Sequence, residues 1–212
     1  MKRILLFILL FSTVLYGCSN EDVTNSSSNG EAKAASGYAD EYSPNPQVPD
    51  DRTLLEMNDS AIDEKGEVTL IKSRYPGDSY EIGPIKLTIH DAKLIHLVPD
   101  HSMIDYFHVL THEEKFDFVK FFVEIENTSE KTANFAPIAL IETNTGEKFD
   151  WEKDIYLEDL NGAIQGGETK QGNLGFILED SEGLEWIEIT TSDVFDENEE
   201  KIYDSQKIRL EL

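Results

Sequence analysis

One stretch, residues 116–129, constrains the fold of this chain more than any other. It reads Phe-Asp-Phe-Val-Lys-Phe-Phe-Val-Glu-Ile-Glu-Asn-Thr-Ser, and every second residue from Val119 to Ile125 is apolar. Alternation with a period of two, in β-branched and aromatic residues, predicts a β-strand with one buried face. The closing Asn-Thr-Ser is typical of a turn. The fold must therefore place a long strand against a hydrophobic core.

The opposite face of this strand carries three phenylalanines among charged residues: Phe116, Phe118 and Phe122. Exposed aromatic patches are uncommon on soluble monomers, so this row is either covered by another segment or forms a patch for a partner. The segment just before the strand, residues 99–115, is the predicted cover.

Further short segments with alternating apolar residues follow one another through residues 67–212, separated by turn residues. They lie at 67–72, 85–89, 94–98, 135–141, 148–151, 172–178, 184–190 and 208–212. Many short strands without repeated helix–strand units predict an all-β fold, a sandwich or a barrel, with one short helical insertion at residues 99–114. Asp91 and Ala92 interrupt the pattern and predict a bulge or bend. The acidic residues 193–204 are predicted to form a loop.

The first 17 residues are predicted to be an export signal. Lys2 and Arg3 precede an apolar run that is too short to span a bilayer as a mature helix, which needs about 20 apolar residues. The run is followed by Cys18, the only cysteine in 212 residues. A single cysteine excludes an intramolecular disulfide, so the fold depends on its own core. An ordinary secretory signal with a chance cysteine is the alternative interpretation.

The residues around the cysteine, Leu15-Tyr16-Gly17-Cys18, resemble the lipobox of bacterial lipoproteins, with an aliphatic residue, a small residue and then the modified cysteine. Tyr16 is bulkier than the residue usual at its position. The resemblance implies that the Cys18 thiol carries a diacylglycerol and that the signal is cut before Cys18. Two or three acyl chains would hold the protein at the membrane, since each buried methylene contributes about 0.8 kcal/mol.

Residues 18–66 are predicted to be the lipidated cysteine and a flexible linker. Residues 25–30 are a polar low-complexity run, and three prolines follow between residues 44 and 49. Apolar residues are sparse and show no sustained period, which is typical of disorder. The predicted domain organisation is therefore a signal peptide (1–17), a linker (18–66) and a sandwich domain (67–212).

All five histidines lie between His90 and His112. Residues 99–114 show the apolar period of an amphipathic helix, which would place His101, Asp105, His108 and His112 on its polar face. Imidazoles one turn apart, with a carboxylate, can bind Zn²⁺, and histidines can also change charge near pH 6–7. The simpler interpretation is a docked helix with a solvated polar face, since closed zinc sites usually have better-defined ligand sets.

Composition disfavours several functions. There are 43 acidic residues against 18 Lys and Arg, for a formal net charge of −25, and such a surface repels nucleic acid. No nucleophile elbow, phosphate-binding glycine loop or metalloprotease motif is found in the sequence. We therefore expect no enzymatic activity and no cofactor other than the acyl groups at Cys18.

Several landmarks together resemble the telokin-like, immunoglobulin-fold domains of unknown function on lipoproteins of Gram-positive bacteria. They are the strand 118–126 with its Asn-Thr-Ser turn, the apolar stretch 138–141, the hairpin 145–149, the turn 166–168 and the strand 172–178. The resemblance covers residues 82–212. It implies an Ig-like antiparallel β-sandwich and an extracellular setting, and it supplies no catalytic residues.

These observations predict a lipoprotein anchored at the extracytoplasmic face of the cell membrane. Its sandwich would act as a binding module for an unidentified envelope protein or ligand. The alternative is a metal-binding or pH-sensing lipoprotein that uses the histidine face.

Overall fold

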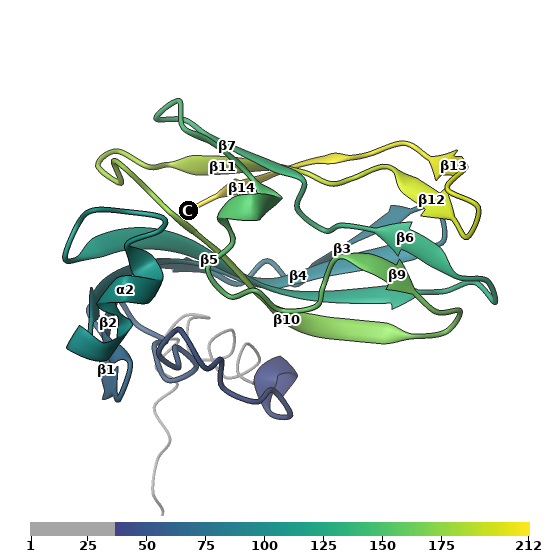
Figure 1. The fold of residues 1–212 in the computed structure, drawn as a ribbon. Coiled ribbons are helices and arrows are strands. Elements are labelled where there is room, and N and C mark those ends of the chain that lie inside the picture. Colours follow the sequence, from purple (N-terminus) through teal and green to yellow (C-terminus); the bar gives the residue numbers. More distant parts are fainter. Residues whose placement is uncertain (1–36) are drawn as a thin grey trace, which may run out of the picture.

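The computed structural model describes residues 37–212 as an antiparallel β-sandwich (Figure 1). Nearly all of its regular structure is strand, which confirms the predicted all-β class. Among the described residues, the one α-helix is α2 (Ile104–Phe107), a single short turn. The predicted signal peptide, Cys18 and the first part of the predicted linker lie outside the described residues.

One layer is a six-stranded sheet, here called the long sheet, with the order β1-β2-β4-β5-β10 and with β3 beside β4. Its strands are β1 (Ser60–Asp63), β2 (Gly66–Arg74), β3 (Asp78–Ile82), β4 (Ile85–Pro99), β5 (Phe116–Asn127) and β10 (Thr169–Ile177). β4 and β5, the two longest, run antiparallel through the middle of this sheet. All the other strand pairs of the sheet are antiparallel as well.

The facing layer consists of two four-stranded sheets, β14-β11-β7-β8 and β13-β12-β6-β9. The first contains β7 (Leu140–Thr143), β8 (Lys148–Asp150), β11 (Trp186–Thr190) and β14 (Lys207–Glu211). The second contains β6 (Ala133–Phe135), β9 (Gly162–Ile164), β12 (Val194–Asp196) and β13 (Lys201–Tyr203). Figure 1 shows them at opposite ends of the sandwich.

The apolar face of β5 lies in the core between the layers, as its alternation predicts. Val119, Phe121, Val123 and Ile125 are at most 1% exposed and belong to a cluster with side chains from all three sheets. Burial of each such side chain contributes about 1.5–3 kcal/mol, an upper bound relative to an extended chain.

The structure also tests the bulge, turns and loop that short stretches of the sequence predict. The register of β4 against β5 shifts between Ile89 and Asp91, which confirms the predicted bulge. Gly146 (φ +92°) and Gly167 (φ +75°) occupy left-handed turns before β8 and β10, where a side chain would be strained. The predicted loop at 193–204 is wrong, because β12 and β13 form a hairpin there.

The predicted flexible linker is wrong for residues 37–66. Residues 37–55, here called the N-terminal strap, pack on the outer face of the long sheet and include the short 3₁₀ helix η1 (Gly37–Ala39). Val48 and Leu54 are fully buried in a second apolar cluster on this face. The strap is polar in composition, but these few apolar residues dock on a sheet face that would otherwise expose its aromatic side chains. Residues 60–63 extend the sheet as β1.

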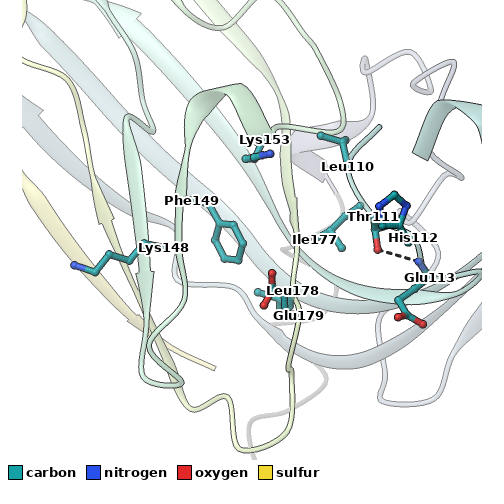
Figure 2. Close-up of a pocket in the computed structure, with 10 residues that line it drawn as sticks. All are labelled: Leu110, Thr111, His112, Glu113, Lys148, Phe149, Lys153, Ile177, Leu178 and Glu179. Atoms are coloured by element: carbon teal, nitrogen blue, oxygen red, sulfur yellow. Dashed lines mark hydrogen bonds between the residues drawn. The ribbon is translucent and has the colours of Figure 1, made fainter. Parts of the chain in front are cut away.

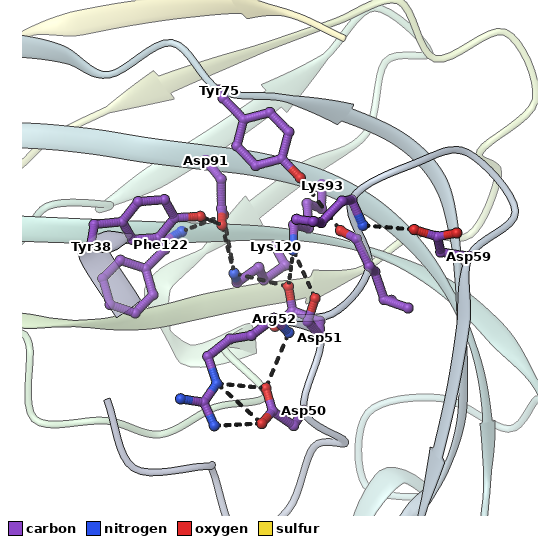
Figure 3. Close-up of polar contacts among 12 residues, drawn as sticks. Tyr38, Asp50, Asp51, Arg52, Asp59, Tyr75, Asp91, Lys93, Lys120 and Phe122 are labelled. Atoms are coloured by element: carbon purple, nitrogen blue, oxygen red, sulfur yellow. Dashed lines mark hydrogen bonds and ion pairs between the residues drawn. The ribbon is translucent and has the colours of Figure 1, made fainter. Parts of the chain in front are cut away.

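A buried ion cluster holds the strap to the sheet (Figure 3). The Asp51 carboxylate accepts hydrogen bonds from Lys93 Nζ at 2.8 Å and Lys120 Nζ at 3.1 Å. Lys120 Nζ also donates to Asp91 at 3.0 Å, and the Tyr38 hydroxyl donates to Asp91. All four charged residues are at most 3% exposed. Two carboxylates thus face two ammonium groups in a site closed to water.

The ion pairs outweigh desolvation in this cluster. Burial by itself raises the pKa of the Asp51 carboxyl, but the ammonium groups of Lys120 and Lys93 hold that pKa well below its ordinary value. Burial likewise lowers the pKa of Lys120, and the carboxylates of Asp51 and Asp91 raise it above its ordinary value. Asp51 and Lys120 are therefore both charged at neutral pH.

The phenylalanine row is covered, so the predicted partner patch is wrong. Phe116, Phe118 and Phe122 are at most 5% exposed. The segment 99–115 packs on the first of them, with 5.1 Å between the ring centroids of Phe107 and Phe116. Tyr156 covers Phe118, and strap residue Tyr38 packs on Phe122 at 5.0 Å. Three separate segments provide the cover that the sequence assigns to one helix.

Candidate functional site

A hollow on the open side of the sandwich lies between β8 and the end of β10. We call it the β8–β10 groove; it has a volume of about 560 Å³. Figure 2 shows its lining: Leu110, Thr111, His112, Glu113, Lys148, Phe149, Lys153, Ile177, Leu178 and Glu179. β8 and β10 are the last strands of their sheets, so the two layers end here without further strands among the described residues. Side chains from three separate parts of the chain meet at this margin.

The groove has an apolar floor and an acidic rim. Phe149, Ile177 and Leu178 are buried or half-buried, whereas Glu113 and Glu179 are exposed. In Figure 2 the Phe149 ring and the Glu179 carboxylate face the same space. An apolar base with a few charged groups is the usual composition of a ligand site.

Lysines are also present at the groove, but one of them is turned away. Lys148 points away from Phe149 in Figure 2, and its ammonium group donates to the Glu142 carboxylate. Lys153 follows in the short 3₁₀ helix η3 (Trp151–Lys153). The carboxylates in the lining therefore outnumber the ammonium groups that remain at the groove.

The outer edge of β10 is covered along part of its length. Asn173 N–H donates to Glu158 at 2.9 Å, and Gly175 N–H donates to Asp154 at 2.8 Å. Gly175 C=O accepts from Ile155 N–H at 2.9 Å. In an antiparallel strand, alternate residues direct their amide groups to the same side. Ile177 therefore also presents its N–H and C=O outward.

The hydrogen bonds that cover the outer edge of β10 are interrupted at Ile177 and continue at Glu179. The Glu147 carboxylate accepts from Glu179 N–H at 2.8 Å and from Asp180 N–H at 3.2 Å. Among residues 37–212, no hydrogen bond is found on the outward N–H and C=O of Ile177. Because Ile177 lies in the groove lining, the groove contains an open main-chain pair between two covered positions of the sheet edge, Gly175 and Glu179.

Asp154 fixes the loop that covers β10 beside the groove. Its carboxylate accepts from Tyr156, Leu157 and Gly175 N–H groups at 2.8–3.2 Å. Burial is the largest influence on this group and raises its pKa to about 6, although these hydrogen bonds favour the ionised form. Tyr106 of α2 donates to Ile155 C=O at 2.6 Å, which joins the same loop to the 104–113 segment.

The structure does not form the predicted histidine face. The helix expected over 99–114 is wrong: it is reduced to the 3₁₀ helix η2 (His101–Met103) and the four residues of α2. His101, Asp105, His108 and His112 are all exposed. His101 and His112 line one hollow of about 590 Å³, which Asp105 and His108 do not line. Within residues 37–212, no three His, Cys, Asp or Glu side chains are placed to hold a metal ion.

Sequence reasoning missed the polar group next to the groove. His96 Nδ1 lies 2.6 Å from Asp117 Oδ1, and Ser181 donates to the other carboxylate oxygen at 2.5 Å. These residues line a smaller hollow of about 280 Å³ together with Glu113 and Glu179. His96 and Asp117 are cross-strand neighbours in β4 and β5, so the strand register, once known, would have paired them.

The part of the chain that the structure describes contains no helix long and apolar enough to cross a bilayer.

Comparison with known proteins identifies a curated relative and several distant structural neighbours. No family model matches the sequence. The uncharacterized protein YdhF of Bacillus subtilis is 49% identical over 237 aligned residues, with both chains covered in full. A crystal structure of a functionally unknown protein from Listeria monocytogenes EGD-e superposes with a TM-score of 0.50 at 13% identity, covering 69% of this chain and 87% of that one; it supports the fold alone. The chain belongs to the same family as YdhF of Bacillus subtilis.

Proposed function

We propose that this protein is a lipoprotein anchored through Cys18 at the extracytoplasmic face of the cell membrane, and that its sandwich is a non-catalytic binding module. The observation that carries the anchor is the position of the one cysteine. It directly follows a basic and then apolar leader, in a Leu-Tyr-Gly-Cys sequence that resembles a lipobox. Acyl chains on that residue would supply a membrane affinity that the acidic surface does not.

The β8–β10 groove supports the binding half of the proposal. In this groove an apolar floor, exposed carboxylates and an open main-chain pair occur together. Loops and sheet margins on a rigid scaffold commonly carry binding functions. The buried ion pairs in the described part of the chain are accounted for by strap attachment, so none of them requires a catalytic role.

The anchor has a direct test in cells. After feeding with an alkyne fatty acid, the wild-type chain is expected to be labelled and to enter the detergent phase on partition, because Cys18 is acylated. Cys18→Ser is expected to be unlabelled and to stay in the aqueous phase. The measurement is in-gel fluorescence of the labelled chain in both phases.

A shifted cysteine is the matched control. In Cys18→Ser combined with Ser19→Cys, the cysteine count is unchanged, but Tyr16 replaces the aliphatic Leu15 at the third position before the cysteine, so no label is expected. An unlabelled wild-type chain would contradict the anchor. Equal labelling of the shifted variant would show acylation that does not depend on the lipobox.

A further inference from the structure

We propose that the β8–β10 groove binds an extended, basic peptide segment of a partner protein, which pairs with β10 at Ile177. This inference rests on the proposed binding function and names its class of partner. The open main-chain pair at Ile177 is the first observation that supports it. A strand that adds to a sheet edge uses the free N–H and C=O groups of that edge, and its alternate side chains enter pockets beside it.

The geometry limits how such a segment would lie. Asp154 and Ile155 occupy the edge at Gly175, and Glu147 occupies it at Glu179. Between these two positions lies Ile177, whose outward N–H and C=O have no hydrogen-bond partner among residues 37–212. The incoming segment would therefore pair over one residue and continue across Phe149 and Leu178 rather than along the whole edge. A short contact of this kind fits a transient interaction, and the side chains would supply most of the selectivity.

Charge selects the class of segment. Glu113 lines the groove and the two hollows next to it, and Glu179 lines the groove and one of these hollows. Asp180 and Glu182 follow Glu179 in the loop before β11, and both are exposed. The positive charges of Lys115 and Lys153 partly offset these carboxylates, and Lys148 is already paired with Glu142. The local excess of carboxylates has the same sign as the formal net charge of −25, so lysines or arginines flanking an apolar residue match the site.

The probe is a fluorescein-labelled Lys-Val-Lys-Val-Lys-Val-Lys peptide, titrated with the full chain in non-ionic detergent and followed by anisotropy. The groove variant is Glu113→Gln with Glu179→Gln. The control variant is Glu197→Gln with Glu200→Gln, which removes the same charge from the β12–β13 hairpin. The proposal predicts that the groove variant binds about tenfold more weakly than wild type, as expected for the loss of about 1.4 kcal/mol, with the control unchanged. Thermal midpoints of all three chains verify that they remain folded.

Three results would overturn the proposal. Equal weakening in both variants, or in neither, would mean that the peptide is attracted to the acidic surface as a whole. Absence of binding to wild type would exclude a basic segment. The proposal would also be excluded if a neutral Ser-Val-Ser-Val-Ser-Val-Ser peptide bound as tightly as the basic one, both to wild type and to the Glu113→Gln, Glu179→Gln variant. That last outcome would leave the binding module itself in place, and the lipid-labelling experiment tests the anchor separately.

Discussion

Replacing Lys120 with methionine is expected to lower the free energy of unfolding by about 3–5 kcal/mol, the usual cost of removing one partner from a buried ion pair. Lys120 Nζ bridges Asp51 and Asp91, and both carboxylates are buried under the strap. Without that ammonium group, the buried Asp91 carboxylate loses its counter-charge. Chemical denaturation followed by tryptophan fluorescence measures the loss.

Lys86→Met is the matched control. Lys86 lies on β4, next to β5, and also pairs with an acid, Glu126 at 3.9 Å, but both side chains are about 40% exposed. Exposed pairs contribute about 0–1 kcal/mol, so this variant is expected to be nearly as stable as wild type. Equal losses in the two variants would contradict the buried cluster.

Adding Asp91→Asn to Lys120→Met measures the interaction energy of Lys120 with Asp91 separately from the contacts that each residue makes with its surroundings. The two changes together are expected to cost less than the sum of the single changes, because the second removes the charge that the first leaves unpaired. The side-chain amide introduced by Asp91→Asn can still accept the hydrogen bond that Phe122 N–H donates to residue 91 at 3.0 Å. Strict additivity would mean that Lys120 and Asp91 do not interact.

Leu54→Ala is expected to lower the free energy of unfolding by about 2–5 kcal/mol, the range for truncating a buried leucine to alanine. Leu54 is fully buried in the apolar cluster under the strap, which also holds Phe107 and Phe118. In a flexible linker the same substitution would have no effect. Equilibrium unfolding in urea provides the measurement.

Met57→Ala tests the same region at an exposed position. Met57 lies three residues further along and is 66% exposed, so its truncation is expected to change stability by less than about 0.5 kcal/mol. If Leu54→Ala were as mild as Met57→Ala, the strap would be a linker after all, and the domain would begin close to residue 67 as the sequence predicts.

The core of the sandwich was predictable because it rests on local alternation. The inward face of β5, the bulge after Ile89 and the turns at Gly146 and Gly167 follow from side-chain period and glycine conformation within a few residues. The strands that were missed are the short ones. β3 and the β12–β13 hairpin have few buried residues, so their pattern resembles that of an acidic loop.

The outer face and the groove depend on contacts between residues far apart in sequence. Asp51 meets Lys93 and Lys120 across 42 and 69 positions, and a lone aspartate in a proline-rich segment shows no period that would reveal this. Similarly, the gap in the edge of β10 exists because Ile155 and Glu147 bind on either side of Ile177. Neither the ion cluster nor the gap at Ile177 can be predicted from the residues of the strand on which it lies.

Site-specific photocrosslinking in living cells tests whether the sandwich binds a partner through the β8–β10 groove. A photoreactive residue is placed at His112, which is exposed at the groove, or at Ile202 on β13, which is 48% exposed and does not line the groove. We expect a discrete crosslinked adduct from position 112, which is lost when Glu113→Gln and Glu179→Gln are added, and no such adduct from position 202. No adduct from position 112, or the same adduct from both positions, would contradict binding through the groove.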